Sequence, residues 1–235
     1  MRLYLIRHAQ SSNNALADPS GRVCDPPLTA LGHRQARRLA RFLSAGAERL
    51  EGGAALGRPL GYRFARLFCS PMYRSLLTTQ YLAKALGLAP EVWVALHEHG
   101  GVYLDHGGEQ GVVGYPGKTR AEMLAEFPGY ILPEDVTERG WWFGAREDYA
   151  GCCDRAARVA ETLRSWAGSE ECIALLSHGG FLDALLKDLL GTPADRGRFY
   201  AHSNTGITCV DLRGDGSVRL EYLNRVDHLP PELVT

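Results

Sequence analysis

Short apolar runs alternate with helical patterns along most of the sequence, and this alternation limits the fold more than any other feature. The runs at residues 2–6, 64–69 and 172–177 are largely continuous rather than alternating in apolarity. A strand buried on both faces of a parallel sheet shows this pattern. We therefore predict an α/β fold, a three-layer sandwich in which a mainly parallel sheet is flanked by helices. In such folds ligands bind at the carboxyl ends of the strands.

The predicted helices have recognisable first and last residues. The predicted ranges are 29–46, 70–86, 149–166 and 181–190 for helices, 91–94 for a further short strand, and 206–212 with 218–223 for a hairpin-like pair. Thr29 is the expected N-cap of the first helix, with Gly46 near its end. Ser70 and Pro71 suit the N-cap and the first helical position of the second helix, which Gly87 is expected to end.

Residues 98–148 differ in composition from the rest of the chain. They are glycine-rich at first, and then contain prolines, a helical pattern over 120–126 and the aromatic sequence 141–143. We interpret them as an inserted lid region that covers a site. Residues 48–61 are predicted to form a surface connection. The length of 235 residues favours a single domain over 1–235.

The charge of the chain is nearly balanced, with 26 Lys and Arg against 27 Asp and Glu. Such a balance gives no overall field that attracts nucleic acid or an anionic membrane, so neither is an expected partner. The arginines within 34–41 have helical spacing and fit a solvated helix face. No apolar run reaches about 18 residues, and no export signal is recognised. Six cysteines without a C-x-x-C pair fit reduced thiols in the cytoplasm.

Cationic side chains occur where three of the predicted strands end. Arg7 and His8 follow the first strand, Arg74 comes shortly after the second, and His178 follows the strand at 172–177. Because the carboxyl ends of parallel strands meet at one edge of the sheet, we expect these four side chains to lie close together. Two guanidinium groups match the geometry of phosphoryl oxygens. The sequence therefore predicts a phosphate site at this edge.

The same cluster indicates phosphoryl transfer through a histidine. A neutral His8 attacks phosphorus if its other ring nitrogen donates to an acceptor such as a backbone carbonyl. His178 is then a donor toward the transferring oxygens, helped by the amides of Gly179 and Gly180 where the next helix starts. Glu98, which follows the short strand at 91–94, is the expected proton donor for the leaving oxygen.

Five motifs occur in a fixed order along the chain. They are RHAQSSNN (7–14), DPPLTALG (25–32), CSPMYR (69–74), LHE (96–98) and LLSHGG (175–180). Together they resemble the histidine phosphatase superfamily, also called the phosphoglycerate mutase-like family. The resemblance implies a phosphohistidine on His8, a phosphate pocket that includes Asn14, a small phosphomonoester as substrate, and neither metal nor other cofactor. Ala9 stands where the family usually has glycine, and Gln10 where glutamate is common.

Other functions remain open from the sequence. A cofactor-dependent phosphoglycerate mutase needs further cations beside the pocket and a tight lid. The 98–148 region has scattered lysine and arginine but lacks the paired arginines of those mutases, so a phosphatase is favoured. A non-catalytic phosphate-binding module would lack a member of the cluster, and none is missing. The oligomeric state is open.

Two further readings concern the region after Glu98. Asp105 and Glu109 compete with Glu98 as the proton donor, but they lie further along a glycine-rich run. Three histidines, at positions 97, 99 and 106, lie near Asp105 and suggest a metal site. Metal ligands usually come from rigid elements with supporting hydrogen bonds, so this alternative is weaker than the phosphate site.

Overall fold

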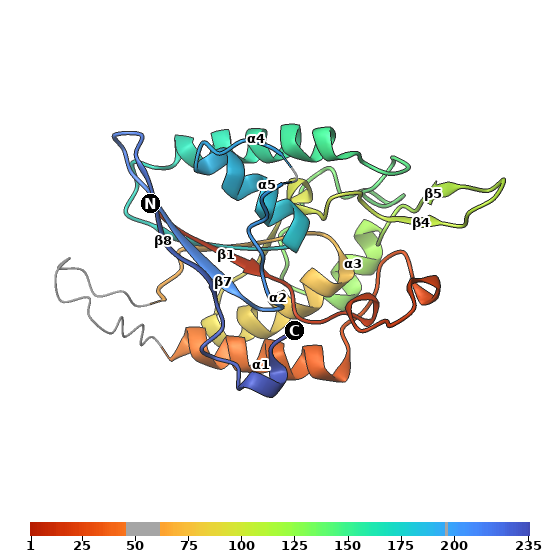
Figure 1. The fold of residues 1–235 in the computed structure, drawn as a ribbon. Helices are drawn as coiled ribbons and strands as arrows, with labels where there is room; N and C mark the ends of the chain where they lie inside the picture. The colour runs from red at the N-terminus through yellow and green to blue at the C-terminus, as the bar shows by residue number, and fades with distance from the viewer. Residues whose placement is uncertain (46–61, 196) are drawn as a thin grey trace.

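A six-stranded sheet with the order β3-β2-β6-β1-β7-β8 forms the centre of the molecule (Figure 1). Its strands are β1 (Arg2–Arg7), β2 (Arg66–Cys69), β3 (Glu91–Val92), β6 (Cys172–Ser177), β7 (Ile207–Leu212) and β8 (Val218–Arg225). The first four run parallel to one another. β7 runs antiparallel to β1, and β8 runs antiparallel to β7. Arg7 lies opposite Ser177 in the β1–β6 pair, and Cys69 opposite Leu176 in the β2–β6 pair. The ends of β1, β6 and β2 therefore meet at one edge, as predicted.

Helices cover both faces of this sheet. They are α1 (Ala30–Ser44), α2 (Tyr73–Leu86), α3 (Arg120–Glu126), α4 (Tyr149–Ser165) and α5 (Gly179–Leu189). In Figure 1, α1 and α2 lie below the sheet and α4 and α5 above it. Tyr4 and Ile6 of β1 are buried with side chains of α1 and α2, whereas Leu3 and Leu5 are buried with side chains of α4 and α5. Because both faces are covered, successive residues must all be apolar. The predicted three-layer α/β sandwich is confirmed.

The structure is a computed structural model that describes residues 1–45, 62–195 and 197–235. The predicted helix end at Gly46 and the predicted connection over 48–61 lie outside the described residues. None of the helices in the described ranges combines the length and apolar character that spanning a bilayer requires.

The helix boundaries confirm two predicted signals and correct a third. The side chain of Thr29 accepts the amide of Gly32 at 2.9 Å and caps α1, and Gly87 ends α2 with a φ of 68°. The predicted start at Ser70 and Pro71 is wrong, because α2 begins at Tyr73. The Ser70 hydroxyl instead accepts the Met72 amide at 3.2 Å, within the turn before the helix.

Two other predicted boundaries shift for local reasons. α5 starts at Gly179 rather than at residue 181. The strand predicted over 91–94 pairs only over Glu91–Val92, because Val94–Leu96 forms a 3-10 helix, η3. Three further 3-10 helices are η1 (Ser12–Asn14), η2 (Pro19–Gly21) and η4 (Pro231–Leu233).

Residues 98–148 contain a hairpin and a helix. The strands β4 (Tyr103–Asp105) and β5 (Val112–Gly114) pair in antiparallel fashion, a feature absent from the predictions, and α3 lies where it was predicted. Met123, Phe127 and Trp141 are buried in the same apolar cluster as side chains of α2. The later part of this region therefore belongs to the core, and the β4–β5 hairpin extends away from the body of the molecule (Figure 1).

Candidate active site

The four predicted cationic residues lie at the shared edge of the sheet. Arg7 ends β1 and His8 follows it, Arg74 lies in the first turn of α2, and His178 is the residue before α5. The Nε of Arg74 donates to Nε2 of His8 at 3.1 Å. The rings of His8 and His178 have their centres 4.9 Å apart. The predicted convergence of these side chains is therefore present in the structure.

His8 is held as a neutral imidazole with a defined tautomer. Its Nδ1 lies 2.7 Å from the carbonyl of Ala9, to which only a protonated nitrogen can donate. The contact from Arg74 to Nε2 requires an unprotonated nitrogen, so Nε2 carries a lone pair, which accepts this hydrogen bond. Burial, followed by the charges of Arg74 and Arg7, lowers the pKa of His8 well below its ordinary value. A neutral ring with Nδ1 donating to a backbone carbonyl is the arrangement predicted for a nucleophilic His8.

Arg74 is buried and Arg7 is half-buried, and both are only partly paired. Nη1 of Arg7 donates to the carbonyl of His202 at 2.6 Å, but its buried Nε has no partner among the described residues. Nη1 of Arg74 lies 3.7 Å from the carboxylate of Asp25. Burial lowers the pKa of both guanidinium groups, although arginine stays charged across the physiological range. These groups retain hydrogen-bonding capacity for an anion.

His178 lies behind His8 rather than on the pocket wall. Its ring is fully buried, and Nε2 hydrogen-bonds the hydroxyl of Ser70 at 2.7 Å. Its Nδ1 is buried with no partner in the described part of the chain. Burial, with Arg74 as the next cause, lowers the pKa of His178 well below its ordinary value. His178 therefore adds a neutral ring to the site.

Glu98 occupies the amino-terminal end of α5. Its Oε1 accepts the amides of His99 at 2.8 Å and Phe181 at 2.9 Å, and Oε2 accepts the amide of Gly180 at 3.3 Å. A Cβ at position 180 would lie 2.8 Å from Oε1, so this close approach depends on glycine. The expectation that the Gly180 amide is free for phosphate needs correction, because Glu98 accepts it. Gly179 lies beside Arg7, where an added Cβ would be 3.6 Å from Nε.

A pocket of about 210 Å³ opens over these residues. It is lined by Arg7, His8, Ser11, Asn13, Asn14, Arg22, Cys24, Pro26, Arg74, Glu98, His99, Gly101 and Tyr103. His8 is only 2% exposed, yet it reaches the pocket surface. Of the competing acids, neither Asp105 nor Glu109 lines the pocket. Asp105 instead accepts the amide of Gly107 at 3.0 Å in the β4–β5 turn.

Several pocket residues were not predicted from the sequence. Arg22 follows η2 and brings a third guanidinium to the wall, and Tyr103 comes from β4. Asn14, which the family resemblance did predict, also lines the pocket, with its Oδ1 accepting the Ser11 amide at 3.1 Å. Asn204 lies beneath it and donates to the carbonyl of His8 at 2.9 Å. No motif in the sequence indicates Arg22, which follows two 3-10 helices in the segment between β1 and α1.

The histidines of the metal-site alternative face different partners. Nδ1 of His97 donates to the carbonyl of Val94 at 2.8 Å, and Nε2 of His106 hydrogen-bonds the hydroxyl of Tyr115 at 2.9 Å. The ring of His99 lies against Tyr149, with centres 6.0 Å apart. Among the described residues, no group of three His, Cys, Asp or Glu side chains is placed to hold a metal ion.

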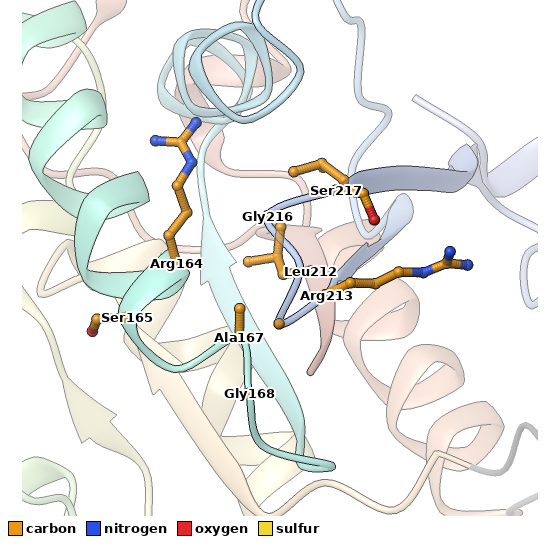
Figure 2. A pocket seen from close by; sticks show the side chains of 10 residues that line it. Arg164, Ser165, Ala167, Gly168, Leu212, Arg213, Gly216 and Ser217 are labelled. Atoms are coloured by element: carbon orange, nitrogen blue, oxygen red, sulfur yellow. The ribbon is translucent and has the colours of Figure 1, made fainter.

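A second cavity, of about 310 Å³, lies at the opposite edge of the sheet (Figure 2). Its wall includes Leu212, whose amide donates to Met1 at the start of β1. The side chains of Arg164 and Arg213 extend away from each other in Figure 2, and Arg164 is paired with Asp188 at 2.8 Å. This cavity lacks convergent polar groups, so the pocket over His8 is the candidate active site.

Comparison with known proteins gives consistent matches along the chain. Residues 3–225 match the family model of the histidine phosphatase superfamily (branch 1). The chain is 28% identical over 227 residues to putative phosphoserine phosphatase 2 of Hydrogenobacter thermophilus, covering 97% of each protein. It is 27% identical over 215 residues to the probable phosphoglycerate mutase GpmB of Yersinia pestis, covering 91% of this chain and 86% of that protein.

The fold also matches solved structures. A mutant phosphoserine phosphatase from Entamoeba histolytica, crystallised with phosphoserine, superposes with a TM-score of 0.61 at 20% sequence identity. The superposition covers 97% of this chain and 99% of that chain. At this identity the likeness shows a shared fold, and it agrees with the layered sheet described above.

Proposed function

Because this chain belongs to the histidine phosphatase superfamily (branch 1), we propose that it hydrolyses phosphomonoesters of small metabolites through a phosphohistidine on His8. The observation that carries this proposal is the geometry of His8. Its Nδ1 donates to the carbonyl of Ala9, and its Nε2 accepts from Nε of Arg74 at 3.1 Å, at the floor of an open pocket. An oriented neutral imidazole beside guanidinium groups suits attack on phosphorus.

The proposed reaction has two steps. In the first, Nε2 of His8 forms a bond to phosphorus while the bond from phosphorus to the substrate oxygen breaks, and Glu98 gives that oxygen a proton. In the second, Glu98 takes a proton from water, whose oxygen displaces His8 and releases inorganic phosphate. Arg7 and Arg74 stabilise the charge on the equatorial oxygens in both steps.

The remaining predicted residues fit supporting roles. We assign Asn14, which lines the pocket, and the amide of Gly179, beside Arg7, to the phosphate. We further propose that Nδ1 of His178, which is buried behind His8 and has no partner among the described residues, supports the same oxygens when phosphate is bound. In Glu98, Oε1 already accepts two amides whereas Oε2 accepts one longer bond. Oε2 therefore has the greater capacity to carry the transferred proton.

Hydrolysis is favoured over the mutase reaction. The putative phosphoserine phosphatase matches this chain over nearly its whole length. The phosphate cluster places arginine side chains where a metal-dependent enzyme would hold a metal ion. We propose a metal-independent enzyme of the histidine acid phosphatase type. We further propose that the predicted lid region, 98–148, borders the site through residues 98–103, which contribute to the pocket wall. We propose that the chain acts as one domain without nucleic-acid or membrane partners. We also propose that it works in the cytoplasm, where its cysteine thiols stay reduced.

A substrate panel with phosphoenzyme trapping tests the function. Phosphoserine, phosphoglycerates, sugar phosphates and nucleotides would be assayed with and without 2,3-bisphosphoglycerate and with a chelator. We expect phosphate release that requires neither 2,3-bisphosphoglycerate nor a metal ion. We also expect an acid-labile, alkali-stable phosphoryl label on the protein. His8→Ala should abolish both turnover and label. Isomerisation that depends on bisphosphoglycerate would support the mutase, and a label that survives in the His8→Ala variant would contradict the role of His8.

A further inference from the structure

The segment that leads into Glu98 is held by side chains at three successive carbonyls. Nη1 of Arg155 donates to the carbonyl of Ala95 at 2.7 Å and to that of His97 at 2.9 Å. The hydroxyl of Ser177 donates to the carbonyl between them, that of Leu96, at 2.7 Å. Buried carbonyls at the end of a 3-10 turn need such donors. The backbone of the three residues before Glu98 is therefore hydrogen-bonded to side chains of α4 and β6.

Arg155 is itself held firmly. It lies on α4 and is only 5% exposed. Its Nε and Nη2 donate to the two carboxylate oxygens of Glu147 at 2.9 and 2.6 Å. This paired contact aligns the guanidinium plane, so that Nη1 points at the two carbonyls. A lysine has one nitrogen and cannot make both sets of contacts.

The same guanidinium also supports the opposite side of Glu98. Its central carbon lies 4.5 Å from the ring centre of Phe181 in the first turn of α5. The amide of Phe181 is one of the two that hold Oε1 of Glu98. Arg155 thus contacts the loop that carries Glu98 and the residue whose amide fixes its carboxylate, without touching the pocket.

We propose that Arg155 is a positioning residue that sets the place of the Glu98 carboxylate for proton transfer. This proposal rests on the proposed function, because it assumes that Glu98 protonates the leaving oxygen. A general acid works only within hydrogen-bonding reach of that oxygen, and a displacement of about 1 Å causes a large loss of rate. Arg155 therefore acts through Glu98, and the departure of a substrate oxygen that needs a proton is the step whose rate depends on the substrate.

The test compares substrates that differ in their need for a proton. In Arg155→Lys, we expect kcat/KM, which reports formation of the phosphoenzyme, to fall by about tenfold or more for an alkyl phosphate such as glycerol phosphate. For p-nitrophenyl phosphate it should fall by less than about threefold. Arg164→Lys is the matched control, because Arg164 lies on the same helix, is exposed, and pairs with the half-buried Asp188 away from Glu98. It should leave both substrates unchanged.

A second background separates positioning from general damage. In a Glu98→Gln protein, adding Arg155→Lys should cause no further difference between the two substrates. If Arg155→Lys fails to fold, Glu147→Gln, which loosens the same guanidinium, should give the same substrate dependence. Equal losses on both substrates, or a difference that persists without Glu98, would overturn the positioning role. Absence of phosphatase activity in the unmodified protein would instead overturn the proposed function.

Discussion

Two clusters of charged side chains, one at the pocket over His8 and one around Lys187, differ in how completely their atoms are paired. The site cluster contains Arg7, Arg74, His8 and His178, with unpartnered nitrogens on Arg7 and His178 within the described residues. A second cluster surrounds Lys187, which is only 2% exposed. Its ammonium donates to Asp183 at 2.7 Å, to the hydroxyl of Tyr149 at 3.1 Å and to a backbone carbonyl at 2.6 Å.

The difference teaches which buried charges serve the fold and which serve a ligand. Lys187 has three donor hydrogens and three acceptors, and the second oxygen of Asp183 accepts the amide of Tyr200 at 2.9 Å. Nothing is left there for another molecule. The site cluster has more positive than negative charge, and burial lowers the pKa of both its arginines. Such an arrangement costs stability and suits an anion that arrives later.

The strongest test of this contrast removes a cation from the site. Arg74→Gln should lower kcat/KM by about 10²- to 10³-fold, since a guanidinium directed at the transferring oxygens is lost. The free energy of unfolding should stay the same or rise, because the change removes a buried charge that is incompletely paired. Kinetics and chemical denaturation of the same preparation check both parts. A large loss of stability with little loss of kcat/KM would show that the arginine serves the fold.

The opposite pattern is expected in the paired cluster. Lys187→Met should lower the free energy of unfolding by about 3 kcal/mol, because Asp183 is left buried without its partner. The kcat/KM of the folded protein should change by less than about threefold. Denaturant titration and assays at low temperature measure the two quantities. The double variant D183N/K187M should lose less stability than the sum of the single changes, and full additivity would show that the pair is not coupled.

The fold was largely predictable from the sequence because the sheet is buried on both faces. Continuous apolarity in β1 and β6 reports that burial directly, and Thr29 and Gly87 mark helix ends through local chemistry. The start of α2 was mispredicted because Ser70 has a tertiary partner: its hydroxyl bonds His178, far away in the chain. The β4–β5 hairpin was missed because its strands are three residues long and carry little pattern.

The convergence of the site was predictable from strand order, whereas its fine geometry was not. Residues at strand ends are brought together by the topology, which placed Arg7, Arg74 and His178 near His8. The contact of Glu98 with the amides of α5 depends on the path of a glycine-rich loop, which sequence does not specify. Asn204 and Arg22 come from loops whose direction is set by tertiary packing.

The acid dependence of activity sharpens the contrast at Asp25, a carboxylate that pairs with Arg74. Asp25 accepts the Tyr73 amide through both oxygens, at 2.9 and 3.1 Å, and lies 3.7 Å from Arg74. Burial raises the pKa of Asp25 to about 6, although Arg74, the Tyr73 amide and Lys118 act in the opposite direction. As pH falls through this value, Asp25 takes up a proton and stops orienting Arg74.

Activity should therefore fall on the acid side of pH 6. Between about pH 7 and pH 5, kcat/KM should drop by about tenfold, and Asp25→Asn should remove this limb when assayed on the same substrate. His8 is not its source, because burial holds the pKa of His8 well below its ordinary value. The raised pKa also means that Asp25 stabilises the fold fully below about 3.8, and that this contribution is lost as pH rises through about 6. An unchanged acid limb in Asp25→Asn would assign it to another group.

The smallest expected effect concerns Arg22, the pocket arginine that is exposed rather than buried. No ion pair holds its side chain in the part of the chain that the structure describes, and a solvated guanidinium contributes little to folding. With the phosphate on Arg7 and Arg74, Arg22 is left to meet a second anionic group on the substrate. Arg22→Gln should raise KM about threefold to tenfold for phosphoserine and leave glycerol phosphate within about twofold, with kcat unchanged for both. A fall in kcat on both substrates would give Arg22 the same role as Arg7 and Arg74, and the distinction between exposed and more buried cations would then not describe this pocket.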